Sequence, residues 1–315
     1  MKEKKSSAHL AIFAYRDVQQ AAVLGLCDLF DVANRNSRAC DGQTVKLQVV
    51  TPDDLAKDEV TCFDAVILPP SLAPNHDWND VVSENWLKKQ HAGGAVLCSV
   101  CAGAFGLGAC GLLDGRAVTT HWMLEDKLQA CFPKADVNSE HILIDDHDIV
   151  SAGGVMAWID LGLFLVTRYL GQQITTLTAR HLLIDPGGRE QKNYRTFRPV
   201  FNHGDPAILK VQHILEKDYK TCTNIESLAS LSTMSQRTFL RRFKAATGLT
   251  PNQYLQHLRI EKARGFLERT RQPISEIAWQ VGYGDVSAFS RVFKEITGLK
   301  AGRYRERFNV LNFNE

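Results

Sequence analysis

Cys101 stands where a thiol could act as a nucleophile. It directly follows a short apolar run, residues 94–100, and precedes a stretch of small residues, which predicts a strand, a sharp turn and a helix. Such a turn presents the side chain at the edge of a sheet, where the amide of Ala102 can stabilise an oxyanion. A helix N-terminus also lowers the pKa of a thiol. The pattern therefore makes cysteine chemistry one hypothesis for this chain.

Cys98 and Cys101 also form a C-x-x-C pair, which could have a redox or metal-binding role. Zinc would need two further ligands at comparable spacing, and we find none, so we expect neither a metal nor a cofactor. A redox-sensing regulator that uses this pair stays open as an alternative. The chain has eight cysteines without a paired framework, and we expect reduced and mostly buried thiols. They are Cys27, Cys40, Cys62, Cys98, Cys101, Cys110, Cys131 and Cys222.

A second pattern is an internal repeat with basic residues. The segment SQRTFLRRFKAATGL at 235–249 returns fifty residues later as DVSAFSRVFKEITGL at 285–299. The matches keep one offset without a gap, which indicates one structural unit used twice. The first-copy residues that recur are Phe239, Arg241, Phe243, Lys244, Thr247, Gly248, Leu249 and Tyr254.

Each copy predicts two helices joined by a turn. Ser235 and Asp285 are typical N-cap residues, and Gly248 and Gly298 are natural helix ends. Phenylalanines four residues apart can share a buried face, and segments 225–231 and 274–281 upstream have apolar residues at helical spacing. In such a helix-turn-helix motif the second helix enters the major groove of DNA, and its amides and nearby cations hold phosphates.

The polar face of each second helix suits contact with bases. Gln236, Arg237 and Arg241 point away from the phenylalanine face in the first copy, as Ser287 and Arg291 do in the second. Between the copies an apolar stripe predicts a helix over 252–268, about 25 Å long at 1.5 Å per residue. Two such motifs could address successive major grooves, about 34 Å apart.

Charge divides the chain unequally. Residues 205–315 carry 18 Lys and Arg against 11 Asp and Glu, a balance of +7. Because the whole chain has a net charge of +2, the first 204 residues carry −5. We therefore expect only the C-terminal part to meet a polyanion.

Residues 8–170 read as alternating strands and helices, which predicts an α/β domain with a mostly parallel sheet covered on both faces. Residues 141–153 predict a strand pair around an Asp-rich turn, and 155–171 a buried helix. In such sheets ligands bind outside the carboxyl ends of the strands. The expected strands are 8–15, 45–51, 63–70 and 94–100, with helices over 20–33 and 81–90.

Residues 205–308 resemble the AraC/XylS family of transcription regulators. The resemblance rests on both repeats and on the pattern A-x5-S-x3-F-x-R-x-F-K-x2-TGL-x-P-x2-YL. It implies an all-α domain with two helix-turn-helix motifs on double-stranded DNA. Family members often carry polar residues at Leu240 and Ala288, so we expect the arginines and contacts with thymine methyls to set specificity. The implied DNA-binding residues are Gln236, Arg237, Leu240, Arg241, Lys244, Ser287, Ala288, Arg291 and Lys294.

Residues 8–185, and 98–122 most specifically, resemble the PfpI-type branch of the class I glutamine amidotransferase-like superfamily, which has a flavodoxin-like fold. Together with the C-terminal resemblance this is the arrangement of GlxA-like regulators. The supporting catalytic groups of the superfamily are replaced. Ala102 stands where PfpI-type peptidases have His, Ala22 where a Glu faces the cysteine, and Pro70 in a loop that often supplies an amide. We therefore expect no enzyme, with a cysteine-dependent hydrolase centred on Cys101 as the alternative.

The resemblance implies a sensing pocket at the carboxyl edge of the sheet. Its expected residues are Cys101, Ala102, His121, Trp122 and Ser71, with His121 as the remaining possible partner of the thiol. The implied ligands are amino acids, amines and related nitrogen compounds. A homodimer is implied as well, and RNA polymerase is a further candidate partner.

The domain boundaries follow from these matches. We expect a sensing domain over 8–185, a linker rich in Gly and Pro over 186–204, and a DNA-binding domain over 205–310. No apolar run approaches the roughly 20 residues of a membrane span, and the N-terminal apolar run is too short for a signal peptide. These features predict a soluble cytoplasmic protein.

Overall fold

The computed structural model describes residues 7–57, 61–73, 78, 80–185, 187, 189–221 and 225–310. The chain divides into two compact units, residues 1–191 and 192–315. Cys222, the basic residues before Ser7 and the last five residues of the chain lie outside the described part.

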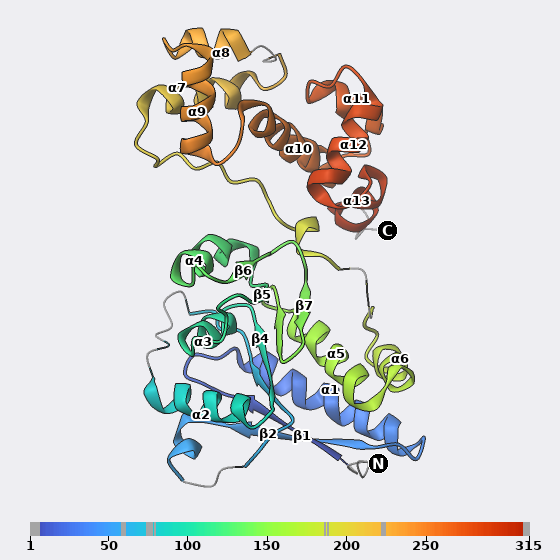
Figure 1. Cartoon of the computed structure of the whole chain (residues 1–315). Helices are drawn as coiled ribbons and strands as arrows, with labels where there is room; N and C mark the ends of the chain where they lie inside the picture. Colours follow the sequence, from blue (N-terminus) through green and yellow to red (C-terminus); the bar gives the residue numbers. More distant parts are fainter. Residues whose placement is uncertain are drawn as a thin grey trace. The chain divides into compact units, whose positions relative to one another are not determined.

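The first unit is built on a six-stranded sheet with the order β2-β1-β3-β4-β8-β7 (Figure 1). Only β7 is antiparallel, and it pairs with β8 across the Asp-rich turn. The mostly parallel sheet and the strand pair are thus both confirmed. The strands are β1 (Ser7–Phe13), β2 (Thr44–Val50), β3 (Ala65–Leu68), β4 (Val96–Val100), β7 (Leu143–Asp146) and β8 (Ile149–Ala152).

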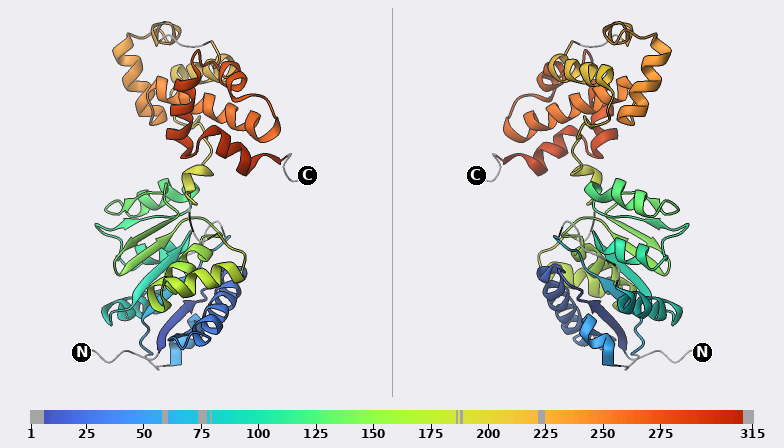
Figure 2. Two further views of the ribbon diagram at one scale, coloured as in Figure 1. Left: turned by 90° about the vertical axis from the view of Figure 1, so that its right-hand side faces the viewer. Right: turned by 90° about the vertical axis from the view of Figure 1, so that its left-hand side faces the viewer.

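Helices cover both faces of this sheet (Figure 2). On one face α1 (Gln20–Arg38), α5 (Trp158–Leu170) and α6 (Gln172–His181) pack on one another. On the other lie α2 (Val81–Ala92) and α3 (Gly103–Ala109). All residues of β3 and β4 are buried, as expected for central parallel strands covered on both sides.

A small subdomain between α3 and β7 was not predicted. It holds a two-stranded sheet of β5 (Ala117–Val118) and β6 (Asp136–Val137), a 3-10 helix η2 (Trp122–Leu124), and α4 (Glu125–Cys131). Strands of two residues leave no periodic signal in a sequence, which is why they were missed.

The second unit is all helical and contains the two predicted helix-turn-helix motifs. The first is α8 (Ile225–Leu231) with α9 (Gln236–Thr247), and the second is α11 (Ile274–Gln280) with α12 (Val286–Thr297). They are joined by α10 (Pro251–Arg269), whose 19 residues span about 28 Å. The remaining helices are α7 (Pro206–Asp218) and α13 (Ala301–Phe308). Across the described residues no helix is both long and apolar enough to span a membrane.

Part of the expected linker packs on the second unit. The Asn193 amide is buried and donates to the carbonyl of Thr297 at 2.9 Å. Farther along, the Phe197 ring meets Tyr254 edge to face at a centroid distance of 5.1 Å. Asn193 and Phe197 of the Gly- and Pro-rich segment 184–206 are therefore packed within the second unit.

The two glycines that end α9 and α12 provide a matched test of this packing. Both have a left-handed backbone, with φ of 75° at Gly248 and 77° at Gly298. A Cβ at Gly248 would meet open space, whereas one at Gly298 would lie 2.7 Å from the Asn193 amide nitrogen. We predict that Gly248→Ala lowers the free energy of unfolding by about 1–2 kcal/mol. Gly298→Ala should cost about 1 kcal/mol more, because the buried hydrogen bond is disturbed.

Urea denaturation of the full-length variants measures the difference. Equal costs for the two substitutions would contradict the packing of Asn193 against the end of α12.

Candidate nucleic-acid interface and ligand site

Both helix-turn-helix motifs are held by the same aromatic triad. In each copy two phenylalanines one helical turn apart pack with inclined rings at 5.5 Å between ring centroids, and the second meets a tyrosine edge to face at 5.4 Å. All six rings are buried. The triads are Phe239, Phe243 and Tyr254 in the first motif, and Phe289, Phe293 and Tyr304 in the second. The fifty-residue repeat is thus a repeat of packing as well as of sequence.

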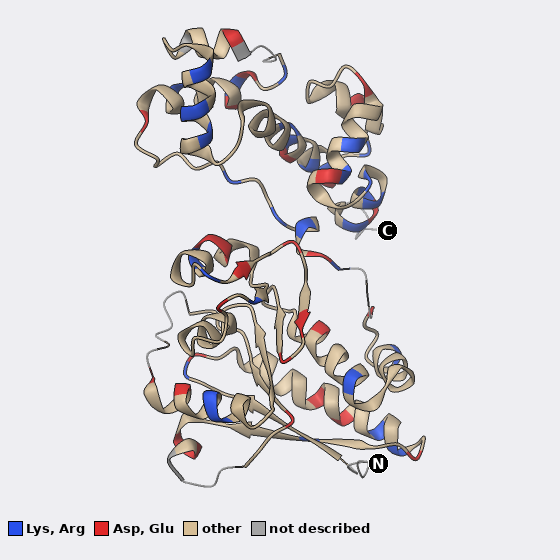
Figure 3. Cartoon of the chain, in the orientation of Figure 1, with Lys and Arg blue, Asp and Glu red and all other residues tan. Residues whose placement is uncertain are grey.

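Burial of this face leaves an exposed polar stripe on each second helix. The stripe residues are spaced i, i+4 and i+7, which places them on one side of a helix. Figure 3 shows cationic residues along α9. The exposed stripe residues are Arg237, Arg241 and Lys244 on α9, and Ser287, Arg291 and Lys294 on α12. Gln236 is exposed beside the first stripe.

The first-turn amides of these helices are already engaged by capping residues. Ser235 accepts a hydrogen bond from the amide of Thr238. The Asp285 carboxylate accepts from the amides of Ser287 and Ala288 at 3.1 and 2.8 Å. The expectation that helix amides hold phosphates therefore needs correction for α12, where the cap occupies two of them, and side chains are left to make those contacts.

Leu240 and Ala288 differ from the other expected DNA-binding residues. Both are half-buried, and Leu240 packs against the core formed by α7, α8, α9 and the first half of α10. The fifty-residue counterpart of Leu240 is Ser290, an exposed hydroxyl on α12 that the motif comparison missed. The repeat offset alone could have found it.

In the first unit Cys101 occupies a sharp turn between β4 and α3. Its φ is 55°, a left-handed value that is uncommon for a residue with a side chain. The turn is fixed from both sides. The Cys101 amide donates to Ala152 at 2.8 Å, and the Cys101 carbonyl accepts from the Thr120 hydroxyl at 2.8 Å. The expected elbow geometry is present.

The thiol in this elbow is not activated. Cys101 is 3% exposed, and burial raises the pKa of its thiol to about 11, although the adjacent amides of Ala102 and His121 partly offset the effect. At pH 7 only about one thiol in ten thousand is then ionised. Ala22, at the position where the resemblance led us to look for a carboxylate, is fully buried and apolar.

Two of the expected pocket residues are placed against this thiol. Ala102 and His121 present their amides to the sulfur, and the His121 ring stacks on Trp122 with centroids 5.6 Å apart. The His121 Nδ1 accepts from the Met123 amide at 3.1 Å. Ser71 is buried, and its hydroxyl donates to the carbonyl of Asp17 at 2.7 Å. The Ser71 hydroxyl is therefore already engaged, and Ser71 contributes to the shape of the edge.

Two aromatic residues belong to this region but were not predicted. Tyr15 packs on Trp78 with ring centroids 4.5 Å apart. Burial, and to a smaller extent the nearby Cys101, raises the pKa of Tyr15. Tyr15 stands two residues beyond the carboxyl end of β1, and that position was the available signal.

A buried acceptor at the same edge has no hydrogen-bond partner among the described residues. The Gln19 amide nitrogen of the backbone donates to Pro70 at 2.8 Å, which places Gln19 beside the loop after β3. Its side-chain Oε1 is buried and receives no hydrogen bond within the described part of the chain. An unsatisfied buried oxygen costs free energy that a ligand or a water molecule can relieve.

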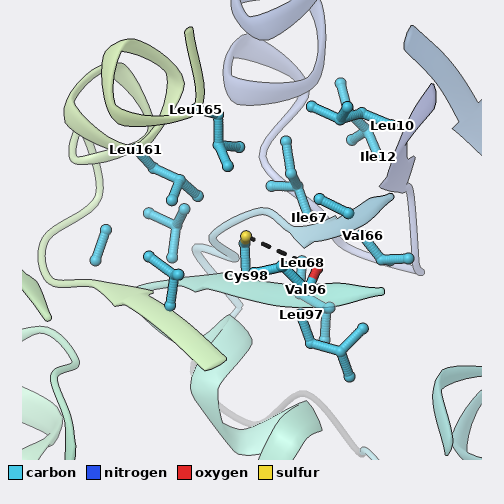
Figure 4. Close-up of a cluster of buried hydrophobic side chains, with 14 of the residues drawn as sticks. Leu10, Ile12, Val66, Ile67, Leu68, Val96, Leu97, Cys98, Leu161 and Leu165 are labelled. Atoms are coloured by element: carbon cyan, nitrogen blue, oxygen red, sulfur yellow. Dashed lines mark hydrogen bonds between the residues drawn. The ribbon is translucent and has the colours of Figure 1, made fainter. Parts of the chain in front are cut away.

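Cys98, the first cysteine of the C-x-x-C pair, is part of the core. Cys98 lies on β4 among Ile67, Leu161 and Leu165 (Figure 4) and is fully buried. Burial raises the pKa of its thiol to about 12. A redox sensor needs an accessible thiolate, so this environment disfavours the redox alternative.

A concavity of about 590 Å³ lies at the opposite edge of the sheet. Two of its lining carboxylates are already paired. Asp145 lies 3.9 Å from Arg168, and Asp148 binds Arg116, which holds the pKa of Asp148 down at about 2. Because ligands of such sheets bind at the carboxyl edge, we favour the Cys101 region as the ligand site.

Comparison with known proteins finds a match for each unit. Residues 30–168 match the DJ-1/PfpI family and residues 228–307 match a helix-turn-helix domain. The HTH-type transcriptional regulator GbdR of Pseudomonas aeruginosa is 26% identical over 253 residues, 79% of this chain and 68% of that protein. The regulator GlxA of Rhizobium meliloti is 27% identical over 235 residues, 73% and 72% of the two chains. The crystal structure of Drosophila melanogaster DJ-1beta covers 57% of this chain and 99% of its own, with 17% identity and a TM-score of 0.49.

The state of Cys101 can be tested by alkylation of the native protein. We predict that iodoacetamide at pH 7 modifies the exposed residues Cys40, Cys62 and Cys131 long before Cys101. Because burial raises the thiol pKa to about 11, the rate at Cys101 should keep rising up to that pH for as long as the fold persists. Peptide mass spectrometry of timed samples measures each site. Preferential labelling of Cys101 at pH 7 would revive the hydrolase alternative.

Proposed function

We propose, on the premise that this chain joins a DJ-1/PfpI domain to an AraC-type helix-turn-helix domain, that it is a transcription regulator controlled by a small metabolite. The observation that carries the proposal is the matched pair of exposed stripes on α9 and α12. Each lies opposite an aromatic triad of the same dimensions. A basic face on a structural helix would not need to recur in this way.

The stripes supply the two kinds of contact that specific DNA binding requires. Arg237, Arg241 and Arg291 can each form a bidentate pair with guanine, while Ser287 can bond a base edge. Lys244 and Lys294, one turn further along their helices, can neutralise phosphates. With α10 about 28 Å long, the two motifs suit successive major grooves on one face of the duplex.

The metabolite would bind at the carboxyl edge of the sheet. Cys101, Ala102, His121 and Trp122 form its centre, with Ser71 at its border and Tyr15 and Trp78 as an aromatic wall. The buried Gln19 oxygen supports a ligand with a hydrogen-bond donor, as an amino acid or amine would have. A ligand that binds one arrangement of the protein better shifts the population of DNA-competent molecules.

We propose a binding role for this site instead of catalysis. A thiol nucleophile needs a depressed pKa or an adjacent base, and burial moves the pKa of Cys101 in the opposite direction. The regulator names of GbdR and GlxA agree with a binding role. Homodimer formation and contact with RNA polymerase belong to the proposal through the family resemblance alone.

The DNA-binding part can be tested by selection from sheared genomic DNA at a stated salt concentration. Wild-type protein should enrich discrete fragments, and Arg241→Ala/Arg291→Ala should lose them, since each base-reading arginine contributes about 1–3 kcal/mol. A matched control, Arg269→Ala/Arg303→Ala, removes two exposed arginines outside α9 and α12 and should keep the same fragments. Enrichment that survives in the first variant, or is lost in both, would refute the assignment of the stripes.

The sensing part can be tested by thermal unfolding with a panel of amino acids and amines. A true ligand at 100 times its Kd stabilises the folded protein by about 2.7 kcal/mol. We predict that His121→Ala/Trp122→Ala abolishes the response to any compound that stabilises the wild type. Arg237→Ala, in the other unit, should keep it. A response that survives the double substitution would place the ligand elsewhere.

A further inference from the structure

Gln191 is a buried glutamine that closes the first unit. Gln191 is only 3% exposed, and both polar atoms of its side-chain amide make hydrogen bonds. Nε2 donates to the carbonyls of Thr120 and His141 at 2.7 and 3.0 Å, and Oε1 accepts from the Trp122 amide at 3.1 Å. Glutamine is mostly exposed in proteins, so a buried amide with this many partners is held in one specific position. We call this position the seat of Gln191.

The seat of Gln191 belongs to the wall of the candidate ligand site. Thr120, which receives the Gln191 amide on its carbonyl, donates its hydroxyl to the carbonyl of Cys101 at 2.8 Å. Trp122, the other partner, stacks on His121. A single residue, Thr120, therefore links Gln191 to the turn at Cys101 through hydrogen bonds.

Contacts of neighbouring residues hold the chain against the first unit as far as Gln191. A Cβ at Gly153, directly after β8, would lie 1.8 Å from the Gln191 Nε2, so the seat requires glycine there. Arg189 binds Asp160 of α5 through two nitrogens, and Glu190 accepts from the Ile142 amide at 3.2 Å.

The residues that follow Gln191 are held equally firmly within the second unit. Asn193 is 3% exposed and donates to the Thr297 carbonyl at the C-terminal end of α12. The Arg264 guanidinium, on α10, donates to the carbonyls of Lys192 and Arg195. The anchored chain thus reaches a helix that we propose reads DNA.

Only Lys192 separates the two buried amides. Gln191, Lys192 and Asn193 form one turn of 3-10 helix, η3 (Gln191–Asn193). Even a fully extended segment of this length spans at most about 7 Å, so a displacement of Gln191 from its seat also acts on the chain at Asn193. We infer that Gln191 is the residue that couples occupancy of the Cys101 edge to DNA binding at α12. This inference rests on the proposed function, and it adds the physical connection between ligand and DNA.

Reciprocity makes the coupling testable before the ligand is known. If a ligand at the Cys101 edge changes the affinity for DNA, bound DNA changes the affinity for that ligand by the same factor, and so must alter the state of the edge itself. The probe is the DNA fragment that the full-length wild-type protein selects, at saturation. Hydrogen–deuterium exchange is followed in peptides that contain residues 119–122, with and without this fragment.

We expect DNA to change the exchange rate of these amides by about fivefold or more in the wild type, which is the low end of typical couplings. Gln191→Met keeps the volume of the side chain but removes the amide, and should bring the change below about twofold while the variant still binds DNA. A purely structural role would alter exchange equally with and without DNA. The control is Gln90→Met, which removes another buried glutamine of the first unit that bonds Thr61 and Phe63. It should keep the DNA-dependent change.

Each outcome decides the inference. A wild type that binds the fragment without a change at 119–122 overturns the coupling and leaves the proposed function standing, as does a change that persists in Gln191→Met. A wild type that selects no fragment overturns the proposed function itself, and the coupling with it. Should Gln191→Met fail to fold, Gly153→Ala displaces the same side chain without altering it and should show the same loss.

Discussion

A single helix that belongs to two hydrophobic cores sets the geometry of the C-terminal unit. The first half of α10 contributes Tyr254 and Leu258 to the core of the first motif, and the second half contributes Ala263 and Leu267 to the core of the second. A helix advances 1.5 Å per residue, so the number of residues between these contacts fixes how far apart the motifs stand. Each core buries one face of the second helix of its motif, α9 or α12, and so determines which side chains remain outside. The exposed arginines are a consequence of where the phenylalanines are buried.

Burial also decides the chemistry of the first unit. The same close packing that places Cys101 at the end of a fully buried strand removes water from its thiol, and the pKa rises. The turn at Cys101 is thus left as a largely apolar edge with a few polar atoms. Such an edge is suited to binding a small molecule, because binding does not require ionisation of the thiol.

Several features of the fold and site follow from local sequence, and others do not. The paired helices, their caps and their glycine ends have strong periodic and capping signals, and the parallel sheet has continuous apolar strands. The elbow at Cys101 could be located for the same reason. The seat of Gln191 could not, because its partners are 50 to 72 residues away and a lone glutamine has no local signature. Asn193 is a similar case, since its partner Thr297 lies 104 residues further along the chain.

We propose that α9 and α12, held apart by α10, address successive major grooves on one face of a duplex. Hydroxyl-radical footprinting of the full-length protein on a selected fragment tests this arrangement. We predict two protected segments about one helical turn, or 10 base pairs, apart on one face, with Arg291→Ala weakening protection of one segment more than of the other. A single protected segment, or protection weakened evenly along the site by that substitution, would contradict it.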